Sequence, residues 1–255
     1  MNLVRALFHR RFIEAVRYPV EMVGGLVTFY VLFLMVFLGA LTFGDSDVRT
    51  SDTLSAVAVG YVVFMLALAS YQGFGQQLMQ ESAGGTLEQL AMSPVGLRRV
   101  LLVDFFAQVT INVLTIGVVV VPIMATTGRW LHVDLVSVLP LVLATLSGVV
   151  GVGLAVGGLY VVFKRLQQVA QIIGFTFVFL VAAPVFERPL LKLLPLGHGN
   201  ALLRRVLVDE VSITELGAGE ILTLLAVNIG WLVVGLVVFG TMERLARERA
   251  LLGQY

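Results

Sequence analysis

The sequence predicts an all-α integral membrane protein that crosses the bilayer six times. Of its 255 residues, 58% are hydrophobic and only 13% are charged, and the mean hydropathy is +0.97. A soluble domain of this size needs far less apolar surface for its core. Apolar runs of about 20 residues, enough to cross roughly 30 Å of hydrocarbon, recur along the chain. Residues 118–121 and 149–156 are apolar at every position, which excludes the alternating pattern of a membrane β-barrel.

The apolar runs divide the chain into spans and polar connections, and a single transmembrane domain covers residues 1–255. The predicted spans are 20–43, 53–75, 99–125, 135–163, 168–186 and 220–242. The first 19 residues alternate basic and apolar positions, which is typical of a helix lying in the membrane interface. The alternative is that these basic residues only set the orientation of the first span in the membrane. We find no soluble domain and no internal repeat.

Lysine and arginine are distributed unequally between the two sides of the membrane. With six spans both termini share one side, and that side carries 11 of the 17 basic residues. The positive-inside rule therefore places both termini in the cytoplasm of a multi-pass protein of the cell membrane.

The cytoplasmic connection 76–98 contains the most informative motif. Gly84 and Gly85 permit a sharp turn, Thr86 can cap a helix, and Gln89 three residues later completes a capping box. Pro94 disfavours a helical residue before it and so marks the other end. The pattern predicts a two-turn helix suited to receive a push from a soluble partner, although an ordinary capped loop has the same signals.

Catalytic chemistry on this chain is disfavoured by what the sequence lacks. A phosphate-binding loop needs Gly-Lys-Ser/Thr, but neither Lys164 nor Lys192 follows a glycine. The three histidines lie on different segments, which argues against a metal site. Ser147 has no histidine in a span to activate it. The net charge of +1 gives no reason to expect nucleic acid as a partner.

Polar residues inside or beside the spans are the remaining candidates. Asp104, Gln108 and Asn112 are spaced by four and share one helix face, which indicates either a transport path or hydrogen bonding between helices. The outer connection 187–219 is rich in proline and glycine, which predicts a broken, partly inserted helix. Its candidate functional residues are Pro195, His198 and Arg204. In the fourth span, Ser147, Gly151 and Ala155 repeat small residues at intervals of four, and Gly153 and Gly157 add two more, which allows another helix to approach closely.

The stretch from residue 81 to residue 94 resembles the coupling loop of the type 2 permease family of ATP-binding-cassette (ABC) exporters. An acidic residue is followed there by Gly-Thr, Leu-Glu, Leu and then Ser-Pro. The matching positions are Glu81, Gly84, Gly85, Thr86, Leu87, Glu88, Gln89, Leu90, Ser93 and Pro94. The polar N-terminus, the six spans and the outer segment around Leu-Pro-Leu-Gly-His are also similar to that family. Gly197-His198-Gly199 departs from the family's usual sequence after the proline.

The resemblance implies a transport subunit that is not itself an enzyme. It would couple through residues 84–90 to separate ABC ATPase subunits, which bind the ATP and Mg²⁺, and would carry no cofactor of its own. It implies membrane lipid as surroundings, a homodimer or a heterodimer with a similar permease, and a hydrophobic or amphipathic cargo such as a drug, a lipid or a lipid-linked glycan. The alternative is a secondary transporter driven by an ion gradient, for which Asp104 is the nearest mid-span charge.

Overall fold

The computed structural model describes residues 3–43, 51–83, 97–128, 134–163, 166–182, 185–186 and 189–248. Within these ranges all regular secondary structure is helix, which confirms the predicted all-α class. The elements are α1 (Leu3–Arg17), α2 (Pro19–Phe43), α3 (Ser51–Ala83), α5 (Leu97–Thr127), α6 (Leu135–Val162), α7 (Gln167–Ala182), the 3₁₀ helix η1 (Pro189–Leu193), α8 (Gly197–Leu207) and α9 (Ala218–Glu248).

Five of these helices are long and apolar enough to cross a membrane. They contain the windows 22–42, 53–73, 102–127, 135–160 and 218–246. The helix at the fifth predicted span, α7, has 16 residues and is about 24 Å long at 1.5 Å per residue, which is shorter than a typical hydrocarbon core. Multi-pass character is therefore confirmed, whereas the count of six spans stays a prediction.

Three of the predicted span ends differ from the ends of the helices. Hydropathy placed the end of the second span at residue 75 and of the last at 242, but α3 continues to Ala83 and α9 to Glu248. Hydropathy marks where a chain leaves hydrocarbon, and a helix continues past that point wherever its residues favour it. The fifth predicted span was too long, because α7 ends at Ala182 instead of 186; Pro184 is unfavourable to a helix continuing through the residue before it.

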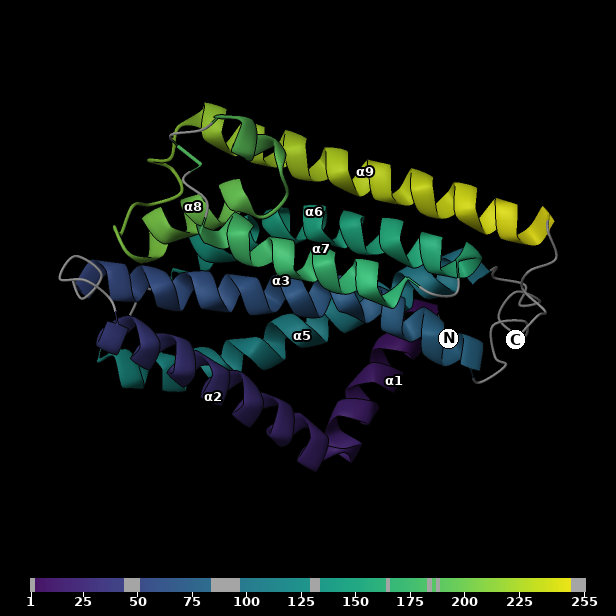
Figure 1. Ribbon diagram of the computed structural model, residues 1–255, viewed down its shortest axis with the longest axis horizontal. Coiled ribbons are helices and arrows are strands. Elements are labelled where there is room, and N and C mark those ends of the chain that lie inside the picture. The colour runs from purple at the N-terminus through teal and green to yellow at the C-terminus, as the bar shows by residue number, and fades with distance from the viewer. Residues whose placement is uncertain are drawn as a thin grey trace.

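The spanning helices lie side by side, and α1 runs obliquely to them (Figure 1). At one end of the molecule α3 ends, α5 begins and α9 ends, and α1 packs against α5 there; we call this the terminal end. At the other end lie η1 and α8, and we call this the hairpin end.

The closest packing in the fold joins α6 and α9. A Cβ atom added to Gly235 would collide with the backbone of Gly151, and one added to Gly158 would lie 2.7 Å from Phe239 Cα. Gly148 faces Asn228 and Gly151 faces Trp231, so residue numbers rise together along both helices and the two run parallel. Gly153 faces α3 instead, and a Cβ added to it would lie 3.1 Å from the carbonyl oxygen of Tyr71. The predicted small-residue approach is confirmed, and it lies within this chain.

Candidate functional site

The predicted coupling helix falls on the gap between α3 and α5. Glu81 lies in the last turn of α3, and its side chain is not described. The other predicted coupling residues lie outside the described residues: Gly84, Gly85, Thr86, Leu87, Glu88, Gln89, Leu90, Ser93 and Pro94. What the structure describes is the pair of helices that the segment 84–96 connects, both of which reach the terminal end (Figure 1).

Asp104 forms a two-point ion pair with Arg11. The Nε atom of Arg11 donates to Oδ1 at 2.8 Å, and Nη2 donates to Oδ2 at 2.7 Å. The Asp104 side chain is 2% exposed and that of Arg11 is 18% exposed. A planar guanidinium that meets both oxygens of a carboxylate fixes orientation as well as distance. This contact joins α1 to the third turn of α5.

Gln108 and Asn112 turn toward each other and toward α3. Gln108 Nε2 donates to Asn112 Oδ1 at 3.2 Å, and Asn112 Nδ2 donates to the carbonyl oxygen of Ala69 at 3.4 Å. The side chain of Gln108 also packs close to Gly73 of α3. The three polar residues of this face thus make hydrogen bonds or ion pairs with other groups of the protein, Asp104 through α1 and Asn112 through α3.

Sequence reasoning selected Asp104 but missed Arg11. A signal was present, because Leu7 and Arg11 are four residues apart and therefore share one face of α1. Leu7 is buried, at 9% exposed, whereas Phe12 on the other side is 60% exposed. An arginine in line with the buried leucine of an amphipathic helix is a candidate for a buried partner.

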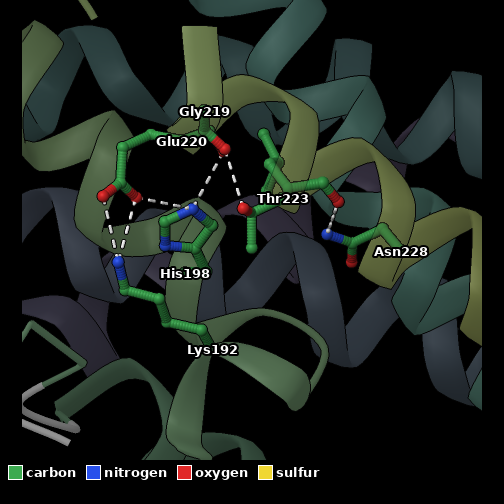
Figure 2. Close-up of polar contacts among 7 residues, drawn as sticks. Lys192, His198, Gly219, Glu220, Thr223 and Asn228 are labelled. Carbon is green, nitrogen blue, oxygen red and sulfur yellow. Dashed lines mark hydrogen bonds and ion pairs between the residues drawn. The ribbon is translucent and has the colours of Figure 1, made fainter. Parts of the chain in front are cut away.

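The hairpin end holds a second charged cluster, drawn in Figure 2. Lys192 Nζ lies 3.0 Å and 3.2 Å from the two carboxylate oxygens of Glu220, in the first turn of α9. Nε2 of His198 lies 3.1 Å from the backbone oxygen of Glu220 and 3.1 Å from its Oε2. Phe186 packs edge-on against the His198 ring and lies beneath the Lys192 ammonium.

The surroundings of His198 shift the pKa of its ring. Burial is the largest cause and lowers its pKa below the ordinary value; the backbone hydrogen bond and the charge of Glu220 oppose the shift, and Lys192 adds to it. Both oxygens at 3.1 Å from Nε2 are acceptors, so the geometry fits a ring that carries a proton on Nε2. Nδ1 is buried and makes no hydrogen bond within the described residues.

The remaining predicted residues of the outer segment have different surroundings. Pro195 is buried just before α8, whereas Arg204 on the last turn is exposed. Sequence reasoning missed Asn200, whose Nδ2 donates to the carbonyl oxygen of Val181 at 2.8 Å. It also missed Gly199, where an added Cβ would collide with Thr145 of α6. These contacts hold α8 against α6 and α7. No group of three or more His, Asp or Glu in the described ranges is placed to bind a metal.

Long apolar helices, a polar helix packed obliquely at one end and a broken helix at the other are the parts of a multi-pass membrane protein. Residues 3–184 match the family model described as CcmB protein. This range is well over half of the chain, and the chain therefore belongs to the CcmB family. No curated protein and no solved structure shows significant similarity to it.

The family corrects the predicted resemblance. CcmB proteins are ABC-2-like permeases, subunits of an ABC-type heme exporter in the cytochrome c maturation system, and they work with an ABC ATPase. The chain is thus a membrane permease component, but its assignment among the drug and lipid exporters of the type 2 family was wrong. A coupling-loop motif and a set of spans are shared by related permeases, so they indicate the class without identifying the family. The expected drug, lipid and glycan cargoes are not supported.

Proposed function

We propose that this chain is the membrane permease through which a CcmB-type ABC complex moves heme outward across the cell membrane. The observation that carries the proposal is the family match, which extends over α1 to α7. ATP and Mg²⁺ would bind to separate ATPase subunits, since the sequence offers no phosphate loop. Both termini would lie in the cytoplasm, so the terminal end would be the cytoplasmic end.

The segment 84–96 would be the docking site of the ATPase. Its proposed contacts are Gly85, Thr86, Leu87, Glu88 and Leu90, with Glu81 and Gly84 before them and Gln89, Ser93 and Pro94 completing the helix. This placement is supported by α3 and α5, which continue past their apolar windows toward the terminal end. A push on the segment would then reach two spanning helices at once.

The permease would work with a second copy or with a similar permease, in contact with lipid. Support comes from the exposed apolar side chains of α2 and α9, whose spanning windows are only 11% and 17% buried. Closure of two ATPases on ATP would favour one of two access states of the permease pair. The shift follows from differential contacts of the ATPase with the two states.

The gradient-driven alternative is weakened by the surroundings of Asp104. A proton- or ion-coupling carboxylate has to exchange its partner during transport. Asp104 instead holds Arg11 through two short contacts. Gln108 and Asn112 are neutral, so they could border a heme path but could not carry a proton.

The first experiment has two readouts. One is co-purification of the chain with the ATPase of its maturation system. The other is the amount of cytochrome c that the chain restores in cells that lack their own CcmB-type permease. Leu87→Asp and Glu88→Lys should abolish recovery of the ATPase and lower cytochrome c formation at least tenfold at normal abundance. Asp209→Lys is the control, because Asp209 is an exposed acidic residue beyond α8 and its change should have no effect on either readout.

The same complex in nanodiscs tests the cargo and the energy source. Heme should change the rate of ATP hydrolysis by the native complex and leave the Leu87→Asp preparation unchanged. A well-folded chain that binds no ATPase, or cytochrome c formation abolished by an ionophore at normal ATP, would overturn the proposal in favour of the gradient-driven transporter.

A further inference from the structure

The link between α1 and α5 joins segments 93 residues apart in sequence. Arg11 contributes two donors and Asp104 both carboxylate oxygens. On α5, Val100, Asp104 and Ala107 are all buried, at 9%, 2% and 0% exposed. Their spacing of four and three places them on one stripe of the helix. The ion pair is therefore embedded in a packed interface, where separation of the charges is costly.

The face of α1 opposite Leu7 and Arg11 is exposed where the structure describes its side chains. Phe12 is 60% and Ile13 44% exposed, as expected for a helix with one face against the protein. Among the described elements, α1 packs chiefly against α5, with a smaller contact to its chain neighbour α2. The position of α1 thus depends on α5.

Asp104 is also close to the proposed point of force. It lies seven residues after Leu97, the first residue of α5, which is about 10 Å along the helix axis. Segment 84–96 leads directly into Leu97. A displacement of the start of α5 would therefore carry Asp104 with it, since an α-helix of two turns moves as a rigid body.

At its other end α1 leads directly into α2. Tyr18 is the single residue between Arg17 and Pro19, the last residue of α1 and the first of α2. The amide of Met22 donates to the carbonyl oxygen of Tyr18 at 3.1 Å, which ties this residue into the first turn of α2. So short a connection transmits both translation and tilt.

We infer that the Arg11–Asp104 ion pair is a mechanical link that makes α1 move with α5, and so carries a displacement of segment 84–96 to α2. The source of the displacement rests on the proposed function; the link itself does not. Arg11 and Asp104 are positioning residues in this scheme, and neither needs to touch the cargo. Without the pair, α5 would still be displaced, but α1 and α2 would not follow its movement.

The chain contains no cysteine, so spin labels can be placed at chosen sites. We would label Phe12→Cys on α1 and Leu114→Cys on α5, both more than half exposed, and dilute the labelled chain with unlabelled chain so that each distance arises within one molecule. Pulsed electron resonance in nanodiscs should give one narrow distance distribution, unchanged when the ATPase is trapped with ATP. Asp104→Asn should widen the distribution about twofold and shift it on trapping.

Three variants distinguish loss of the α1–α5 link from a general loss of structure. Arg11→Gln removes the other partner and should widen the distribution similarly, and exchange of the charges in Arg11→Asp/Asp104→Arg should narrow it again. Arg244→Gln removes an exposed ion pair of α9 and should leave it as in the native chain. A native distance that shifts on ATP trapping, or an Asp104→Asn distribution as narrow as the native one, would overturn the inference.

A coupling readout completes the test. The Asp104→Asn complex should retain its ATPase and hydrolyse ATP at a near-native rate, while cytochrome c formed per ATP falls at least fivefold. Unchanged yield per ATP would overturn the inference. If the native chain binds no ATPase, the proposed function fails, but the distance distributions measured without ATP still decide whether the pair links α1 to α5.

Discussion

The two ends of the molecule each contain an ion pair, but they are built differently. At the terminal end, Asp104 is 2% exposed and Arg11 supplies a planar two-point contact. At the hairpin end, Lys192 and Glu220 are 23% and 30% exposed, and the buried group beside them is the ring of His198. A buried charge pair is costly to separate, whereas a partly hydrated one is readily exchanged for water and salt. The terminal end thus depends on charge, and the hairpin end on close packing around α8.

The largest effect is expected from Asp104→Asn. The change keeps the size of the side chain but removes the buried charge that Arg11 contacts at two points, so the free energy of unfolding should fall by about 3 kcal/mol. Unfolding in mixed micelles by added denaturing detergent measures it. Arg244→Gln, at a pair whose side chains are 82% and 56% exposed, should have no measurable effect; equal losses in the two variants would remove the contrast between buried and exposed pairs.

The next effect tests packing at the hairpin end. In Gly199→Ala the new methyl group would collide with Thr145, and forcing α8 away from α6 should cost about 1–3 kcal/mol. Gly217→Ala is the matched control, because an added Cβ there meets nothing within 4 Å. Thermal unfolding followed by tryptophan fluorescence compares the two. If both variants unfold at the same temperature, α8 is not held by the close contact between Gly199 and Thr145.

A smaller effect is expected from Lys192→Gln. Loss of its contact with Glu220 should cost about 1 kcal/mol at low salt, and the difference should vanish near 1 M salt because the pair is partly hydrated. The loss from Asp104→Asn should persist at the same salt concentration. An ionic-strength series of unfolding measurements on both variants checks this, and a salt-independent Lys192→Gln effect would show that the outer pair is shielded like the inner one.

The smallest effect is a pH dependence from His198. Its pKa is lowered in the folded protein, so on acidification the unfolded chain takes up the proton first. Stability should therefore be intact above the ordinary histidine pKa of 6.5 and should decline as the pH falls below it, with at most one proton bound on unfolding. Unfolding midpoints between pH 8 and pH 5 measure this slope, and His198→Gln should flatten it. An unchanged slope in the variant would assign it to another group.

Much of the architecture could be predicted from composition and periodicity. The positions of α1, α2, α3, α5, α6 and α9 agree with the predicted segments, since in lipid each backbone polar group has to be satisfied within a helix. The close approach of Gly151 to α9 followed from its small-residue spacing. The length of α7 and the continuation of α3 to Ala83 did not follow, because hydropathy reports the solvent around a helix and not the end of its hydrogen bonding.

The sequence by itself determined that this protein is a helical, multi-pass membrane subunit with no phosphate loop, and it marked Asp104 and His198 as unusual. Only the tertiary structure decided what these residues contact: Arg11 for Asp104, and Glu220 for His198. Local spacing identifies residues that share a face of one helix. It contains no record of which face of a distant helix will meet them, because that choice is made when many weak packing contacts are satisfied together.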